Sequence, residues 1–453
     1  MQEKKTLIVF EPETPSVPAR PVEPDTPVKP PEEGRKPSLR KEAFISSPPS
    51  PSSVSYRITK DGEPSDGVPD IFDNTYSVTD PSGIRYDFRD GLRLMIPKGM
   101  EGEYHVVAED SRIRFKAVDA TLKAGGSVVS SKKWFIPWDI TVTKEGKPVM
   151  EISMDLSGKE VALHFPKSGM GDTIAWFSCA EPFMERTGCV LTCCMEKRMR
   201  VLFESEYPRI KWEDEDAWSK SPYYAVYHLG IYSPDNECDR QPEDFRLNGL
   251  HEAAALILGL DDLDIAPPRV ASADLTMPTP DDPYVCIATS ASARCKEWLN
   301  PNGWPVVVDW LKSNGYNVVD IDRDFIHGGQ GTLCGATDRT GDIDLRERVA
   351  VLKGAKAFIG VSSGLSWLAW ASGTPVVLIS GWTLPRTEFP TPYRVINRLV
   401  CHGCWNDGRE DYDHVDGNYC PRHRDTPREH ECSKGISACQ VIMQLARALG
   451  VEP

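Results

Sequence analysis

Long apolar runs and an excess of basic residues are both missing from this sequence of 453 residues. No apolar run approaches the roughly 18 residues needed to cross a bilayer, so we expect no transmembrane segment. Lys and Arg number 52 against 67 Asp and Glu, a net charge of -15. Nucleic acids and anionic membranes bind an excess of basic residues, so neither is an expected partner, although a few local donors can hold a phosphorylated small molecule.

We also expect no export signal in the first residues of this sequence. The first apolar cluster, Leu7 to Phe10, is too short for the core of a signal peptide and is followed at once by Glu11 and Pro12. The 13 cysteines are an odd number, which favours thiols or a metal site in a reducing compartment over a disulfide framework. We therefore expect a cytoplasmic protein.

The first half of the chain changes character twice. Residues 1–54 are rich in proline, Glu, Lys and Ser, and we expect a disordered tail with little to bury. Residues 55–158 contain short runs with period-two alternation, such as Tyr104 to Ala108, separated by turn residues. This pattern predicts a small antiparallel barrel or sandwich.

From residue 159 onward, apolar strands alternate with helical stretches, which is typical of α/β folds. A first series fills 159–275, with a helical stretch expected at Thr173 to Phe183, and a second fills 276–398. We interpret the two series as Rossmann-like domains that face each other across a cleft. A closing helix is expected within 436–453.

The motif Ser168-Gly-Met-Gly-Asp172 follows a predicted strand and opens a helix. Ligands bind at the carboxyl ends of strands in open α/β sheets, and glycines such as Gly171 allow the backbone to approach a ligand closely. Asp172 fits the ordinary role of a helix cap and equally fits a general base that projects into the cleft.

Two loops of the second series carry candidate phosphate ligands. After the strand that ends near Val361, the backbone amides of Ser363, Gly364 and Leu365 would point out of a helix N-terminus, with the Ser362 hydroxyl beside them. The alternative is a serine-capped helix whose tryptophans are core. After the first strand of the series, the segment from Thr289 offers Arg294 and Lys296, either of which could reach a phosphate.

Residues 399–435 are loop-rich and contain four cysteines, Cys401, Cys404, Cys420 and Cys432. A segment of this kind buries too little apolar surface to order itself, and four thiolates on one tetrahedral metal would stabilise it. Both iron and zinc suit such a site. Competing histidine ligands are His402, His414, His423 and His430, and we expect the other cysteines to be small core residues.

Three motifs in order are similar to those of heptosyltransferases that use ADP-heptose: Gly-Met-Gly-Asp172, Lys296, and Val361-Ser-Ser-Gly-Leu-Ser-Trp367. Four further segments narrow the resemblance to one branch of these enzymes: Phe245–His251, Ala266–Arg269, Phe389–Asn397 and Cys401–Asp407. The sequence resembles the bacterial autotransporter heptosyltransferases over about residues 60–450.

That resemblance implies a GT-B fold with a preceding β-barrel domain and a cysteine-bound iron (Fe3+) finger. It implies transfer of heptose from ADP-glycero-manno-heptose to side-chain hydroxyls, mostly serine, of an autotransporter passenger protein before export. It also implies a large ring-shaped homo-oligomer, a dodecamer in the type member.

Carried over residue by residue, the resemblance implies that Asp172 is the catalytic base and that Lys296 faces the donor phosphates. The amides of residues 363–365 meet the diphosphate, and the four cysteines of residues 399–435 bind the iron. One position departs from the wider family, because lipopolysaccharide heptosyltransferases carry an acid where Ser362 stands. The autotransporter branch carries serine there, which favours that branch.

Serine hydroxyls are poor nucleophiles, so we hypothesise that Asp172 removes the proton while Lys296 and the amides hold the departing ADP, with inversion. One alternative is transfer onto a lipopolysaccharide core, which would need a basic or amphipathic membrane-facing patch that the sequence lacks. The other is a nucleotide-binding scaffold without chemistry, for which Asp172 and Lys296 would be unnecessary.

Overall fold

The computed structural model describes residues 57–58, 71–72, 76–232, 238–260, 266–323, 333–410 and 418–453. The predicted proline-rich tail, residues 1–54, lies outside the described residues, and so does His414. Along the described chain, no helix combines the length and the apolar character needed to cross a membrane.

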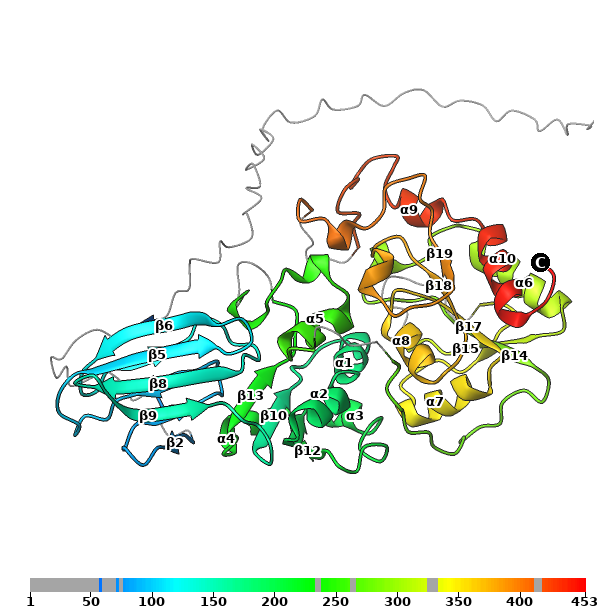
Figure 1. Ribbon diagram of the computed structural model, residues 1–453. Helices are drawn as coiled ribbons and strands as arrows, with labels where there is room; N and C mark the ends of the chain where they lie inside the picture. Colours follow the sequence, from blue (N-terminus) through cyan, green and yellow to red (C-terminus); the bar gives the residue numbers. More distant parts are fainter. Residues whose placement is uncertain are drawn as a thin grey trace, which may run out of the picture. The chain divides into compact units, whose positions relative to one another are not determined.

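The N-terminal part is built from two antiparallel sheets, as its alternating runs predict (Figure 1). In β5, the buried residues Tyr104, Val106 and Ala108 alternate with more exposed ones, which is the period of a strand with one face in the core. The first sheet has the order β1 (Arg57–Ile58), β7 (Ser127–Val129), β4 (Arg93–Met95), β3 (Arg85–Asp87), β2 (Val78–Thr79). The second has the order β6 (Phe115–Leu122), β5 (Tyr104–Asp110), β8 (Trp138–Lys144), β9 (Lys147–Ser153).

A four-stranded parallel sheet follows, and its strands are buried runs such as Val161 to Leu163. Its order is β12 (Lys211–Glu213), β11 (Val190–Cys194), β10 (Glu160–His164), β13 (Ala225–His228). The accompanying helices are α1 (Met170–Phe177), α2 (Ala180–Thr187), α3 (Lys197–Arg200), α4 (Ala217–Lys220) and α5 (Leu250–Ile257).

The helical stretch expected at Thr173 to Phe183 is two helices, α1 and α2, rather than one. Pro182 has no amide with which to bond the Ser178 carbonyl, so the regular i to i-4 ladder is interrupted there. The Cys179 amide donates instead to the Trp176 carbonyl at 3.1 Å, and the Ser178 hydroxyl donates to the Ala175 carbonyl at 2.6 Å. These bonds satisfy the end of α1 locally.

The second parallel sheet has six strands. Its order is β16 (Thr337–Asp338), β15 (Asn317–Asp320), β14 (Tyr284–Ala288), β17 (Ala357–Val361), β18 (Val376–Ile379), β19 (Tyr393–Val395). Its helices are α6 (Gly303–Ser313), α7 (Leu345–Gly354), α8 (Gly364–Ala371), α9 (Glu431–Lys434) and α10 (Ala438–Leu449). The closing helix α10 lies beside α6 (Figure 1). It packs on α6 and β19, and its buried Val441 and Leu445 belong to the same apolar cluster.

Candidate active site

The loop between β10 and α1 fixes the direction of the Asp172 carboxylate. Gly169 precedes the helix with extended backbone (φ -65°, ψ 151°), and Asp172 is the third helical residue. Its Oδ2 accepts a hydrogen bond from the Gly169 amide at 3.1 Å. The helix-cap role that the sequence left open is therefore present, and it holds the carboxylate at the N-terminus of α1.

The environment of Asp172 also changes its acidity. Burial raises the pKa of this carboxyl above its ordinary value, while the charge of Lys296 and the hydrogen bond from Gly169 offset part of the rise. A raised pKa makes a carboxylate a stronger base, which suits proton abstraction. The influence of Lys296 also means that the predicted base and the predicted phosphate ligand are electrostatic neighbours.

The loop between β17 and α8 presents two amides rather than the predicted three. The Ser363 amide donates to the Val361 carbonyl at 2.7 Å, so it is used within a tight turn. Gly364 and Leu365 occupy the first two helical positions, where an α-helix offers no acceptor for the amide. Within the described chain, these two amides make no hydrogen bond, and they sit at the positive end of the helix dipole.

These two loops meet. A β-carbon added at Gly364 would lie 3.0 Å from Cβ of Met170 and 3.1 Å from the amide nitrogen of Gly171. A β-carbon at Gly171 would lie 2.7 Å from Cδ1 of Trp367. Glycine at both positions therefore permits the N-termini of α1 and α8 to approach within van der Waals contact.

The loop after β14 carries the remaining predicted donor ligands. Lys296 ends a short 3-10 turn (Arg294–Lys296), and its ammonium donates to Ser292 Oγ at 3.1 Å. Both the amide and the hydroxyl of Thr289 donate to Asp322 Oδ2, at 2.6 and 2.9 Å. Because its hydrogen is directed to this buried carboxylate, the Thr289 hydroxyl can meet a ligand only as an acceptor.

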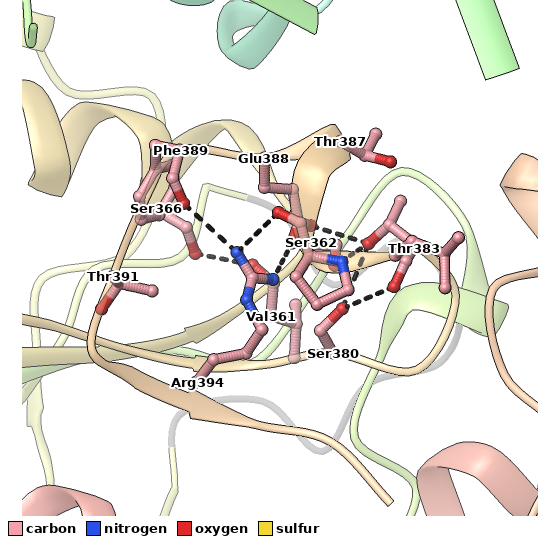
Figure 2. A network of polar contacts seen from close by, with 12 residues as sticks. Val361, Ser362, Ser366, Ser380, Thr383, Thr387, Glu388, Phe389, Thr391 and Arg394 are labelled. Atoms are coloured by element: carbon pink, nitrogen blue, oxygen red, sulfur yellow. Dashed lines mark hydrogen bonds and ion pairs between the residues drawn. The ribbon is translucent and has the colours of Figure 1, made fainter. Parts of the chain in front are cut away.

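The sequence analysis missed a polar network under the β17–α8 loop (Figure 2). Thr383 Oγ1 donates to Glu388 Oε1 at 2.9 Å and lies 3.2 Å from Ser362 Oγ. Glu388 is buried and forms an ion pair with Arg394. The available signal was that Ser380 to Thr383 directly follow β18, at the strand edge where ligands bind.

The four cysteines of residues 399–435, which we call the cysteine finger, share one environment. Cys404, Cys420 and Cys432 are buried and Cys401 is half-buried. The pKa of the Cys401 and Cys432 thiols is raised to about 12, chiefly by burial. Glu431 adds to the rise at Cys401, and neighbouring cysteines of the finger add to it at both. Thiols that oppose one another's ionisation in this way are the groups that a bound cation would stabilise as thiolates.

The ligand atoms that the structure brings together in the described part of the finger are not the four sulfurs. Within the described residues, Cys401, His423 and Glu431 form the group of potential metal ligands whose atoms all lie within 4.8 Å of one another. The Glu431 carboxylate accepts a hydrogen bond from the Arg428 guanidinium and another from the Cys401 amide, the latter at 3.4 Å. Nε2 of His423 is buried without a hydrogen bond in the described structure, so His423 remains a candidate ligand.

The end of the cysteine finger is tied to the segment that follows Lys296. The Leu299 amide donates to Ser433 Oγ at 2.8 Å, and the Trp298 indole donates to the Ile436 carbonyl at 3.0 Å. Cys295, directly before Lys296, packs in one apolar cluster with Cys404. The finger therefore supports the loop that carries Lys296.

The finger is also tied to the loop after β18 and to the segment before α5. The amides of Gly403 and Trp405 donate to the carbonyls of Gly381 and Trp382, at 2.8 and 3.1 Å. Asn406 Oδ1 accepts the Leu384 amide at 2.9 Å, and its Nδ2 donates to the Arg246 carbonyl at 2.8 Å. One segment thus contacts both parallel α/β halves.

Comparison with solved structures defines the class of protein. The iron-containing dodecameric glycosyltransferase TibC from enterotoxigenic Escherichia coli matches with a TM-score of 0.75 and 40% identity, over 83% of this chain and 98% of TibC. A TibC structure in complex with ADP-D-beta-D-heptose gives the same TM-score, over 83% and 97% of the two chains. The fold is that of a GT-B glycosyltransferase, as the sequence predicted.

Comparison of sequences defines the family. Residues 80–146 match the N-terminal domain of glycosyltransferase TibC, and residues 260–406 match glycosyltransferase family 9 (heptosyltransferase). The autotransporter heptosyltransferase TibC of E. coli is 42% identical over 82% of this chain and 93% of its own length. BAHTCr of Citrobacter rodentium is 41% identical over 81% and 89%. The chain belongs to the autotransporter heptosyltransferase family.

One relative shows that membership is not sufficient for activity. BimC of Burkholderia thailandensis, 37% identical over 83% of this chain and 88% of its own length, is named an inactive autotransporter heptosyltransferase. The case for catalysis by this chain therefore rests on its own side chains.

Proposed function

We propose that this protein transfers heptose from ADP-heptose to hydroxyl side chains, chiefly serine, of an autotransporter passenger protein. Its active relatives are named for heptose transfer to autotransporters, and TibC binds ADP-D-beta-D-heptose. The observation that carries the proposal is the contact of Gly171 with Gly364. That contact brings the first turn of α1, which carries Asp172, to a helix N-terminus with two unused amides.

Asp172 is the base in this reaction. As the acceptor oxygen attacks the anomeric carbon of the heptose, its proton passes to the Asp172 carboxylate, whose raised pKa favours proton uptake. The new bond joins the acceptor oxygen to the anomeric carbon, and the bond from that carbon to the β-phosphate oxygen breaks. A single displacement of this kind inverts the configuration of the sugar.

The leaving group is ADP, whose β-phosphate gains negative charge as the bond breaks. The Gly364 and Leu365 amides, the dipole of α8 and the Lys296 ammonium all favour that charge. The Ser363 amide is used within the turn, so Ser363 shapes the loop and does not donate to the phosphate. Gly171 has no side chain, which allows α1 to approach α8 closely.

This chemistry divides the work among segments of the chain. Residues 159–275 supply the base and face the acceptor, and residues 276–398 hold the nucleotide sugar. The β domain at 55–158 and the closing helix at 436–453 flank them, and the finger at 399–435 supports both halves.

We assign the cysteine finger an iron (Fe3+) bound by Cys401, Cys404, Cys420 and Cys432, with zinc as the alternative metal. TibC is iron-containing, and the raised thiol pKa values of the finger fit a site that a cation completes. The metal supplies folding free energy to the finger and takes no part in the transfer step.

The proposed acceptor, a passenger protein modified before export, places the enzyme in the cytoplasm, where the finger thiols stay reduced. TibC is dodecameric, and we propose a large homo-oligomer for this chain. Light scattering of the purified protein tests the assembly.

The decisive experiment is co-expression with an autotransporter passenger encoded beside this chain, followed by intact-mass analysis. An added heptose mass that depends on Asp172 supports the proposal. An unmodified passenger, or a mass added equally by the Asp172→Asn variant, would contradict it.

A further inference from the structure

Two histidines, which we call the histidine pair, end neighbouring strands of the first parallel sheet. His164 is the last residue of β10 and His228 is the last residue of β13, and the two are register partners in adjacent strands (Figure 1). Their Nδ1 atoms lie 2.8 Å apart, within hydrogen-bond distance. His228 is 7% exposed and His164 is half-buried. The transfer mechanism above gives this pair no role.

The two rings are neutral and share one hydrogen. The pKa of His164 is lowered to about 4 and that of His228 to about 2, chiefly by burial, and the charge of Arg240 adds to both decreases. A neutral imidazole carries one N–H, so one Nδ1 donates to the other, and the accepting ring carries its own hydrogen on Nε2. The pair therefore has one outward N–H and one Nε2 without hydrogen.

The charges around the pair favour one of the two possible arrangements. Nε2 of His164 lies 3.9 Å from Oε1 of Glu215, and a carboxylate favours an N–H on the nitrogen that faces it. Nε2 of His228 is buried with no hydrogen-bond partner in the described structure, and the charge of Arg240 disfavours a further proton on that ring. His228 therefore donates to His164, and the N–H of His164 faces Glu215.

A tryptophan packs on both rings and belongs to the segment that carries Glu215. The Trp218 ring lies 5.2 Å from that of His164 and 4.5 Å from that of His228, between centroids. Trp218 lies in α4, three residues after Glu215. The same helix is held from the β domain, because the buried Arg89 guanidinium donates to the Trp218 carbonyl at 2.7 Å. These contacts fix the turn between β12 and α4 beside the histidine pair.

Glu215 in turn binds the loop that precedes Asp172. Its Oε1 accepts a hydrogen bond from the Lys167 amide at 2.9 Å, between the end of β10 and the start of α1. Two residues further along the chain, the Gly169 amide donates to Asp172 Oδ2. The direction of the Asp172 carboxylate therefore depends on the path of the loop that Glu215 holds.

We propose that Glu215 and the histidine pair are positioning residues of the transfer reaction. The pair and Trp218 keep the Glu215 carboxylate in place, and Glu215 keeps the Lys167 amide in place. The β10–α1 loop then presents the Asp172 carboxylate to the acceptor hydroxyl in one orientation. The inference rests on the proposed function, because it requires Asp172 to be the base.

Initial rates of heptose transfer, together with titration calorimetry with ADP-heptose, test the inference. Glu215→Ala removes the acceptor of the Lys167 amide. We expect kcat to fall about ten- to 100-fold, the scale for a misplaced catalytic group, and ADP-heptose affinity to change by less than about twofold. Glu215→Gln keeps an acceptor oxygen and should restore most of the rate. Glu213→Ala, at an exposed acid of the same segment, is the matched control.

Variants of His228 test the shared hydrogen bond. His228→Leu removes the donor to His164 and should lower kcat with little change in ADP-heptose affinity. His228→Asn keeps an N–H donor near the position of Nδ1 and should lose less of the rate. Chemical denaturation shows whether each variant folds, and if His228→Leu is unfolded, the Glu215 variants decide the outcome.

A double variant separates positioning from general destabilisation. Positioning acts through Asp172, so Glu215→Ala should change the residual rate of the Asp172→Asn variant by less than about twofold. A loss that only destabilises the protein would be equal in the two backgrounds. The inference is overturned by such equal losses, or by an unchanged kcat in Glu215→Ala.

Failure of the proposed function gives a different result. If the unmodified protein neither binds ADP-heptose nor transfers heptose, the proposed function is wrong, and the inference is wrong with it. If the protein transfers heptose in a reaction that depends on Asp172 and Glu215→Ala matches it, the inference alone is wrong.

Discussion

The indole of Trp367 lies against Gly171 so closely that a β-carbon at residue 171 would come within 2.7 Å of Cδ1 and 3.3 Å of Nε1. Trp367 cannot easily move away, because the rings of Trp370 and Phe389 pack on it at 5.6 and 5.0 Å between centroids. The meeting of α1 and α8 therefore depends on a single missing methyl group.

Gly171→Ala should separate the two loops. The added methyl overpacks the contact, so we expect the free energy of unfolding to fall by about 1–3 kcal/mol and heptose transfer to fall at least about tenfold. Chemical denaturation and initial rates measure both. Gly99→Ala is the control, since a β-carbon at Gly99 meets nothing within 4 Å. Equal behaviour of the two variants would show that the contact is unimportant.

Asp172→Asn should stop transfer while preserving the donor site. An amide cannot take the proton, so we expect the rate to fall by about 100- to 10,000-fold with ADP-heptose affinity nearly unchanged. Asparagine can still accept the Gly169 amide, so stability should be retained. Asp344→Asn, at the N-cap of α7, controls for loss of a capping carboxylate. Substantial transfer by Asp172→Asn would exclude this residue as the base.

Lys296→Met should alter the pH dependence of transfer as well as its rate. The Lys296 charge lowers the pKa of the Asp172 carboxyl, so its removal raises that pKa further. A base with a higher pKa is protonated at a higher pH, and the acidic limb of kcat/KM should shift upward in pH. A rate profile over about pH 5–9 measures the shift. An unchanged limb would mean that the two groups do not interact during the reaction.

Cys420→Ser should remove the metal and loosen the finger. We expect the protein to lose bound iron or zinc by elemental analysis and to unfold at a lower denaturant concentration. Cys439→Ser, at an exposed cysteine in α10, should change neither property. His423→Ala separates the two ligand sets, because metal retained in this variant supports four sulfur ligands and metal lost assigns His423 to the site.

Asp320 should make stability depend on pH near neutrality. Burial and the neighbouring Asp322 raise the pKa of the Asp320 carboxyl to about 7, and its Oδ2 has no partner in the described structure. The folded state therefore holds a proton that the unfolded state has lost above its ordinary pKa near 4. The stabilisation is complete below about pH 4 and is lost as the pH rises to about 7. Asp320→Asn should make the free energy of unfolding less dependent on pH between about pH 4 and pH 7. An unchanged dependence would mean that other groups cause it.

The sequence predicts well those parts of the fold that depend on local pattern. A buried apolar run followed by glycine or serine predicts both a strand and the start of the next helix. One example is β17, which is followed by the start of α8 at Gly364. The closing helix α10, Ala438–Leu449, also lies within the predicted range 436–453. In each case the apolar periodicity and the capping residue that predict the element are close together in the sequence.

Contacts between segments that are far apart in the sequence could not be predicted from these local patterns. Thr383, Glu388 and Arg394 form a network with Ser362 only because β17, β18 and β19 are neighbours in one sheet. Likewise, nothing in the local pattern shows that the Ser363 amide turns back to Val361. The roles of Asp172 and Lys296 in transfer remain predictions that the variants above test.

The bonds between the cysteine finger and its surroundings have a consequence for protein engineering. Excising residues 399–435 to obtain a smaller enzyme would remove the acceptor of the Leu299 amide and the side chain that binds the Arg246 carbonyl. Each of these part-buried hydrogen bonds contributes about 0.5–1.5 kcal/mol, which the excision would forfeit. The finger is therefore not a detachable appendage, and any minimal version of the catalyst must rebuild those anchors with new side chains.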